Sequence, residues 1–359
     1  MHLRHGMART LGYDSYTPLG YRRMRRVDYD AADVRALPRP GGGARRAAGG
    51  PHLEARRAEH GWDRLRFWDE ALVDPAGNPK PAGDHDFLVA QAQAMFDDMD
   101  GRLGDFYRMM VSGGFLDLKN RPGKGGRRVL HVLPHGRRAV HLRQLQRHNA
   151  DIGVFTHEMG HAFQNWQSRD QPGVDYLWPT MEAAEINSMG LEFLTHPQMQ
   201  RLVGAAEADR FRRMHLITSL EFLPYGVCVD HFQHEVYANP DATRRAARDV
   251  QRLERRYMPW TDYGDLAYPA KGGRWQAKQH IYRSPFYYID YTLALCCALQ
   301  FWVKSRHDYA ASLDAYVALC GRGGSAPFQA LVRSAGLVSP FAPCALAEVV
   351  REAEAVLAP

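Results

Sequence analysis

The sequence predicts a mainly α-helical protein. Beyond Asp151, apolar residues recur at helical spacing in long stretches that end at Gly- and Pro-containing breaks. Residues 86–112 show the same spacing, typical of one or two amphipathic helices, and no 20–50-residue period recurs, which excludes a solenoid. The predicted helices cover residues 86–112, 152–168, 180–195, 199–237, 241–257, 285–304, 308–320 and 343–357.

Composition indicates a folded protein of a reducing compartment. The 359 residues are 45% hydrophobic and 24% charged, which excludes general disorder. Five cysteines without a CxxC pair argue against a disulfide scaffold or a cysteine-built metal site. The opening MHLRHGMART has no apolar signal-peptide core, and the longest apolar run, 291–303, is too short to span a bilayer. We therefore expect a cytoplasmic protein with no membrane partner.

The net charge of +6 is concentrated in two segments. Residues 1–60 contain 12 Arg, no Lys and 6 acidic residues, and residues 118–150 contain 9 Lys and Arg and no acidic residue, so the rest of the chain sums to −9. Clustered arginine without acidic residues can neutralise phosphates, which makes nucleic-acid binding one alternative function. The two segments lack interleaved aromatic platforms and a recognition motif, so nucleic acid is the less favoured partner.

The strongest chemical signal is HEMGH at residues 157–161. On a helix, His157 and His161 are four residues apart and project from one face, so both imidazoles can bind one Zn²⁺. Glu158 then lies beside the metal and can accept a proton from the bound water. The alternative interpretation is two surface histidines around an ion-paired glutamate. Apolar residues on either side of the motif favour a buried helix and therefore a metal site.

A second carboxylate-rich stretch, MEAAEINSMGLEF, offers a third ligand. A catalytic zinc takes three protein ligands and keeps one position open, and no third histidine closely follows the HExxH sequence. Glu185 and Glu192 are seven residues apart, two turns along one helix face. We predict Glu185 as a ligand and Glu192 as the carboxylate that orients a ligand histidine. The alternative is a pair of solvated carboxylates, but Ile186 and Phe193 indicate a packed helix.

An aromatic-rich stretch, QHIYRSPFYYIDY, spans residues 279–291. Peptide hydrolysis at zinc develops an oxyanion that the metal neutralises only in part, so a neutral His or Tyr donor is expected nearby. Tyr288 and Tyr291 are three residues apart and share a helix face. Read by itself, such a segment is more often core, and its combination with the zinc motif favours a site.

Together these stretches resemble the oligoendopeptidase F family of zinc peptidases, relatives of thimet oligopeptidase. The motifs, in the family's order, are HEMGHAFQNWQSR, EAAEINSMGLEF, DHFQHEVYANP, GGRWQAKQHIYRSPFYYIDYTLALCCALQFW and SAGLVSPF. The resemblance extends from about Asp151 to the C-terminus, and more loosely over residues 61–120. It implies a helical, zincin-like catalytic domain with a deep channel that admits short unstructured peptides.

The resemblance also implies site residues. One Zn²⁺ per chain would be held by His157, His161 and Glu185, with Glu158 as general base.

In the aromatic stretch, His280 matches the family's histidine before the tyrosine cluster. Tyr291 is the predicted donor to the oxyanion, because YxxY before a long apolar helix resembles related zinc dipeptidases. Tyr288 is then a predicted substrate contact. Tyr287 remains the alternative donor, since it lies four residues before Tyr291.

Two departures from the family pattern stand out. Family members are longer, and this chain matches from partway in, near ARTLGYDSYTPLGYRRMRRVDYD, so one channel wall is expected to be missing. Where the family has an edge strand resembling GG-x-C…PF-x-F-x-NFNGT, residues 121–149 are basic and lack strand alternation. Residues 35–60 break the pattern in a similar way. Compensating frame shifts in a GC-rich gene are one hypothesis for both stretches, which translation of the alternative frames would test.

We therefore expect a basic N-terminal remnant with a Gly/Pro/Arg-rich linker over residues 1–60, and a helical zinc peptidase domain over residues 61–359. The predicted function is a zinc-dependent endopeptidase that hydrolyses short unstructured oligopeptides. The alternatives are a zinc-binding but catalytically impaired remnant of such an enzyme and, less favoured, a basic nucleic-acid-binding protein.

Overall fold

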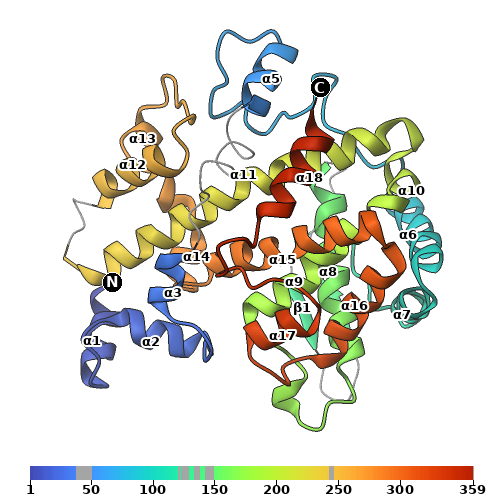
Figure 1. Ribbon diagram of the computed structural model, residues 1–359, viewed down its shortest axis with the longest axis horizontal. Helices are drawn as coiled ribbons and strands as arrows, with labels where there is room; N and C mark the ends of the chain where they lie inside the picture. Colours follow the sequence, from blue (N-terminus) through green and yellow to red (C-terminus); the bar gives the residue numbers. More distant parts are fainter. Residues whose placement is uncertain are drawn as a thin grey trace.

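The computed structural model describes residues 1–37, 51–119, 122, 129–132, 138–141, 149–241 and 246–358. In this part of the chain the protein is mainly helical, as the periodicity predicts (Figure 1). None of the described helices is both long enough and apolar enough to cross a membrane.

Three helices form the centre of the molecule: α8 (Asn149–Gln167), α9 (Met181–Leu194) and α15 (Tyr288–His307). α9 packs against both α8 and α15. The long helix α11 (Ala205–Ala238) packs against α15 and runs across the molecule (Figure 1). α16 (Tyr309–Arg322) covers α8 and α15. This arrangement buries apolar residues of every central helix, including Met159, Phe163, Ile186, Leu191, Leu293 and Phe301.

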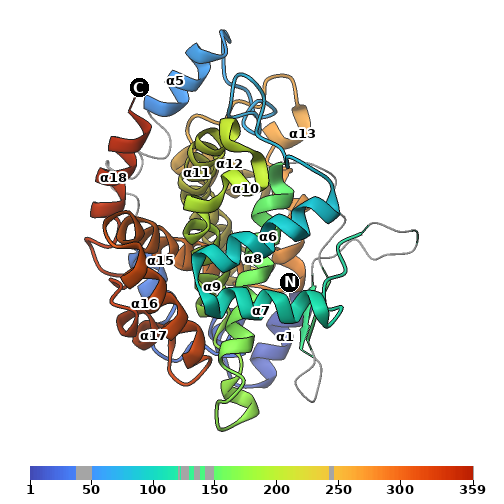
Figure 2. The same cartoon turned by 90° about the vertical axis from the view of Figure 1, so that its right-hand side faces the viewer.

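The remaining elements surround this centre. α6 (His85–Met99) and α7 (Gly101–Ser112) pack on each other, and Figure 2 shows them on the side of the centre where α8 lies. The other described helices after residue 200 are α10 (Gln200–Val203), α12 (Ala246–Tyr257), α13 (Ala267–Ala270), α14 (Gln279–Arg283), α17 (Phe328–Ser334) and α18 (Ala347–Leu357).

Two short strands precede α8. β1 (Val129–Val132) and β2 (Arg138–His141) pair antiparallel, with Val129 opposite His141. The sequence does not predict these strands, because the segment lacks the alternation of apolar and polar residues. Pairing needs only the backbone N–H and C=O groups, which every pair of extended segments can offer. Half of residues 35–60 and most of residues 121–149, the stretches of the frame-shift hypothesis, lie outside the described residues.

The N-terminal region packs on the rest of the protein. α1 (His2–Thr10), α2 (Tyr16–Arg23) and α3 (Ala31–Ala36) lie at the C-terminal end of α11 (Figure 1). They bury the side chains of Ala8, Tyr16, Leu19, Tyr21 and Val34. α5 (Pro51–Glu59) falls within the stretch expected to be a remnant and linker, yet its Arg56 is buried and ion-paired with Glu221 of α11 at 3.1 Å.

Two of the differences from the predicted helix boundaries arise where the backbone has a positive φ. The helix expected over 199–237 is interrupted at Gly204, whose φ of +89° separates α10 from α11. The helix expected from residue 285 begins at Tyr288, because Phe286 has a φ of +66°. Such left-handed residues end helical geometry locally, and apolar periodicity does not reveal them.

The contact between α8 and α9 depends on Gly160, the glycine of the HEMGH sequence. A Cβ at this position would lie 2.5 Å from the carbonyl oxygen of Asn187 and 2.6 Å from the Cα of Ser188. These are backbone atoms of α9, so they cannot move aside as a flexible side chain can. Only a residue without a side chain permits so close an approach of the two helices.

We predict that Gly160→Ala lowers the free energy of unfolding by about 1–3 kcal/mol, because it overpacks this contact. Gly153→Ala in the same helix is the matched control, since its Cβ would meet its nearest neighbour at an ordinary 3.8 Å. The control should be neutral or up to about 1 kcal/mol more stable, owing to helix propensity. Urea unfolding of both variants measures the difference, and equal midpoints would contradict the role of Gly160.

Candidate active site

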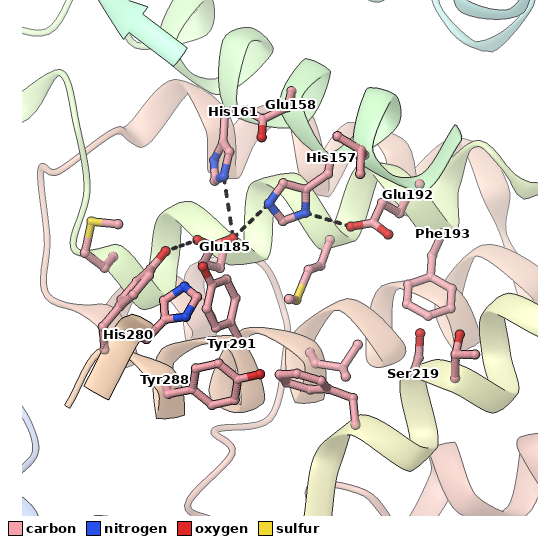
Figure 3. Close-up of a pocket in the computed structure, with 18 of the residues that line it drawn as sticks. His157, Glu158, His161, Glu185, Glu192, Phe193, Ser219, His280, Tyr288 and Tyr291 are labelled. Carbon is pink, nitrogen blue, oxygen red and sulfur yellow. Dashed lines mark hydrogen bonds and ion pairs between the residues drawn. The ribbon is translucent and has the colours of Figure 1, made fainter. Parts of the chain in front are cut away.

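Two helices bring the predicted metal ligands together. α8 directs His157 and His161 toward α9, because residues four apart on a helix share a face. Glu185 projects from α9 into the space between the two imidazoles (Figure 3). The Gly160 contact sets the short distance that this meeting requires.

One carboxylate oxygen lies between the two histidines. Glu185 Oε2 is 3.2 Å from His157 Nε2 and 3.5 Å from His161 Nε2. The three residues each offer one ligand atom, and these atoms all lie within 4.8 Å of one another. The imidazole planes are nearly perpendicular, at 88°, so the two nitrogens approach the same point from different directions.

The electrostatics of this cluster favour a positive charge at its centre. Burial by itself would lower the pKa of His157, but Glu185 and Glu192 together raise it well above its usual value. Burial would likewise raise the pKa of Glu185, but His161 and His157 hold it well below its usual value. The carboxylates therefore stabilise positive charge at this point, either as protons on the imidazoles or as a bound divalent metal ion.

A line of polar side chains orients His157 from behind. Glu192 Oε1 lies 2.8 Å from His157 Nδ1, and its Oε2 lies 3.0 Å from His215 Nε2. His215 Nδ1 in turn lies 2.9 Å from His196 Nε2. The contact with Glu192 directs Nε2 of His157 toward Glu185, the arrangement that metal-ligating histidines use. Sequence reasoning did not identify His215 or His196, since neither belongs to a recognisable motif.

Glu158 lies beside the ligands and keeps its carboxylate uncommitted. It is 7% exposed, it lines the same pocket, and it makes no hydrogen bond or ion pair with any other described residue. A carboxylate in this position can accept a proton from a water molecule that sits between it and the ligands.

The three candidate ligands form one wall of a pocket of about 890 Å³. The facing wall is aromatic and comes from α14 and the start of α15 (Figure 3). Tyr287 donates a hydrogen bond from its hydroxyl to Glu185 Oε1. The rings of His280 and Tyr291 lie 5.9 Å apart by their centroids, while Tyr288 is 4% exposed and packs edge-on against both rings.

Burial sets the protonation of the aromatic wall. It lowers the pKa of His280, with help from the charge of Lys278, so that His280 is neutral at pH 7. It raises the pKa of Tyr287 and Tyr291 well above the usual value. Both phenols therefore remain protonated and can donate hydrogen bonds at neutral pH.

The three converging side chains fit a zinc ion by their chemistry. Two imidazole nitrogens and one carboxylate oxygen are the donor set of many catalytic zinc sites, which keep the fourth position open. The open pocket borders all three residues, which leaves room for water and substrate. The fold and the site thus define a helical protein with an HExxH-type candidate metal centre.

Comparison with known proteins agrees with this class. A profile of peptidase family M3 matches residues 95–349. The chain is similar to the structure of PZ peptidase A with an inhibitor, with a TM-score of 0.93 and 38% sequence identity. It is also similar to a structure assigned as an oligoendopeptidase F, with a TM-score of 0.91 and 41% identity. A further structure so assigned, from Bacillus anthracis, matches with a TM-score of 0.86 and 36% identity.

The chain belongs to peptidase family M3, a family of metallopeptidases. The three alignments cover 99% of this chain but 63%, 63% and 61% of the solved structures, so the chain spans about three fifths of their length. A comparison with curated protein sequences finds no match.

We predict that Glu192→Gln lowers zinc affinity by about 10- to 100-fold, because the candidate ligand His157 loses its charged orienting partner. Glu352→Gln in α18 removes an ion pair with Arg306 of α15 and is a control distant from the site. Competition with a chromogenic chelator measures both affinities, and an unchanged affinity in Glu192→Gln would contradict the orienting role.

Proposed function

We propose that the protein is a zinc-dependent endopeptidase that hydrolyses short unstructured oligopeptides. The observation that carries this proposal is the position of the Glu185 carboxylate between the Nε2 atoms of His157 and His161. Membership of peptidase family M3 supports the same reaction. The proposed metal is one Zn²⁺ per chain, held by these three residues.

The chain's own residues supply the proton transfers. When bound, zinc polarises the peptide carbonyl and lowers the pKa of a water molecule. Glu158, uncommitted and shielded from bulk solvent, takes the proton from the attacking water and later delivers it to the leaving amine. Its place on the same helix turn as His157 and His161 keeps it beside the ligands throughout the reaction.

The aromatic wall would stabilise the oxyanion of the tetrahedral intermediate. Tyr291 and His280 are neutral donors at pH 7, so they strengthen their hydrogen bonds as negative charge develops. The hydroxyl of Tyr287 is already engaged by Glu185, which favours Tyr291 as the principal donor. Tyr288 would pack against the substrate from behind these groups.

The pocket and the cysteines support the remaining expectations. A volume of about 890 Å³ is that of a site for a small ligand, which favours short peptides over folded proteins. All five cysteines are free and four of them are buried, as expected for a protein of the reducing cytoplasm.

Turnover of a quenched fluorescent peptide by the zinc-loaded protein tests the function. We predict that Glu158→Gln abolishes turnover, because an amide cannot accept the proton from water, while one zinc per chain remains bound. Asp209→Asn, in an exposed helical ion pair with Arg212, is the matched acid-to-amide control and should retain turnover.

The outcome also separates the two readings of the site. Zinc at one per chain without peptide cleavage in the wild-type protein would contradict the endopeptidase and support a catalytically impaired zinc protein. If Glu158→Gln cleaved the peptide at the wild-type rate, the assignment of Glu158 as the general base would be contradicted.

A second prediction distinguishes the tyrosines. Tyr291→Phe should lower kcat by about 10²–10³-fold without affecting bound zinc, because it removes a donor to the oxyanion. Tyr287→Phe should instead weaken zinc binding, because Glu185 loses its hydrogen bond. Steady-state kinetics and zinc titration of both variants decide the assignment, and the reverse pattern would exchange the two roles.

A further inference from the structure

The turn before α15 is held in an unfavourable conformation next to the proposed active site. Phe286 has a φ of +66°, a left-handed conformation that is rare for a bulky residue. Such a conformation persists where the surroundings over-determine it, and it often occurs at functional sites. The next residue is Tyr287, and the α15 helix that follows carries Tyr291.

Both backbone polar groups of Phe286 bind buried side chains. Its N–H donates to Gln233 Oε1 at 2.8 Å, and its carbonyl oxygen accepts a hydrogen bond from the Arg26 guanidinium at 2.6 Å. Its ring is fully buried and lies among rings of the N-terminal region and α11. These rings belong to Tyr16, Tyr21, His234 and Tyr237.

The same guanidinium also holds the first turn of α15. Arg26 pairs with Asp290, and both side chains are 0% exposed. The guanidinium carbon lies 4.4 Å from the ring centroid of Tyr21 and 5.5 Å from that of Tyr29. Nη2 of this guanidinium donates both to the backbone carbonyl of Phe286 and to the carboxylate of Asp290, and so joins groups on either side of Tyr287.

The N-terminal region reaches the second active-site helix as well. The hydroxyl of Tyr29 donates to Glu182 Oε1 at 3.1 Å. Glu182 lies in the first turn of α9, three residues before the ligand Glu185. Arg26 and Tyr29, three residues apart in sequence, thus contact the starts of both helices that carry the site.

We propose that Arg26 is a positioning residue for peptide hydrolysis: it holds the Phe286 turn and the start of α15 so that Tyr287 and Tyr291 face Glu185. This inference rests on the proposed function for its catalytic consequence. The buried pair of Arg26 and Asp290 does not by itself indicate that Arg26 serves stability, because apolar residues packed in place of a buried ion pair often stabilise a fold equally well. The geometry of the guanidinium, bound to both the turn and the helix, favours positioning.

The first test keeps the positive charge but removes Nη2, the nitrogen that donates both hydrogen bonds. In Arg26→Lys we expect kcat to fall by about 10²-fold, since small displacements of a catalytic group have effects of this size. KM should change by less than about threefold, because the loss is confined to the transition state. Arg23→Lys, at an exposed position of the same region, is the matched control and should retain the wild-type kcat.

The second test displaces the turn without touching the charge. A Cβ on Gly20 in α2 would lie 2.6 Å from the Phe286 ring, which has no room to yield. Gly20→Ala should therefore reproduce the fall in kcat. Gly6→Ala in α1, where a Cβ would meet nothing within 4 Å, is its control for the change in helix propensity.

Amide hydrogen exchange gives a readout that needs neither zinc nor turnover. In the full chain, exchange over residues 284–291 should accelerate at least about tenfold in Arg26→Lys and in Gly20→Ala, and remain unchanged in the two controls. Measurement well below each unfolding midpoint, with zinc stoichiometry determined in parallel, separates a local displacement of the turn from global unfolding.

Unchanged exchange over residues 284–291 in both variants would overturn the proposal. So would a wild-type kcat per folded molecule in Arg26→Lys. A wild-type protein that binds zinc but cleaves no peptide would overturn the proposed function separately. In that case the amide hydrogen exchange of residues 284–291 still tests whether Arg26 holds the turn in place, because this measurement does not depend on activity.

Discussion

The close approach of α8 and α9 at Gly160 is the contact on which the site depends. It brings Glu185 of α9 within 3.5 Å of both histidines of α8, and so makes one cluster from residues separated by more than twenty positions. Because backbone meets backbone here, the distance between the candidate ligands is set by the helix crossing rather than by flexible side chains. The pocket, the orienting Glu192 and the aromatic wall are all arranged around this crossing.

Several buried charges of the protein are balanced by a nearby charge of opposite sign. Glu185 is shared by two histidines, and Arg26 is paired with Asp290 where neither is exposed. Arg56 of α5 is likewise paired with Glu221. Isolated charges in such places would be costly, so each pair also constrains the elements that it joins. Arg26 and Arg56 of the basic N-terminal region are thus used in buried ion pairs, which weakens the interpretation of its positive charge as a nucleic-acid-binding surface.

Local patterns predicted much of the fold and the candidate site. Apolar periodicity located the central helices to within a few residues, because it records which face of each helix is buried. The spacing of four between His157 and His161 placed both on one face. Periodicity did not reveal the ends at Gly204 and Phe286, since it records side-chain burial and not backbone φ. It also did not indicate that residues 1–37 would pack into the core.

The sequence by itself determined the helical class, the HExxH pair and the candidate third ligand, because these follow from spacing along one helix or from residue chemistry. Only the tertiary structure decided which hydroxyl meets Glu185, which histidines extend the line behind His157, and how Arg26 reaches the Phe286 turn. Those contacts join residues far apart in the chain. Their distances depend on how whole helices cross, and no local pattern encodes that geometry.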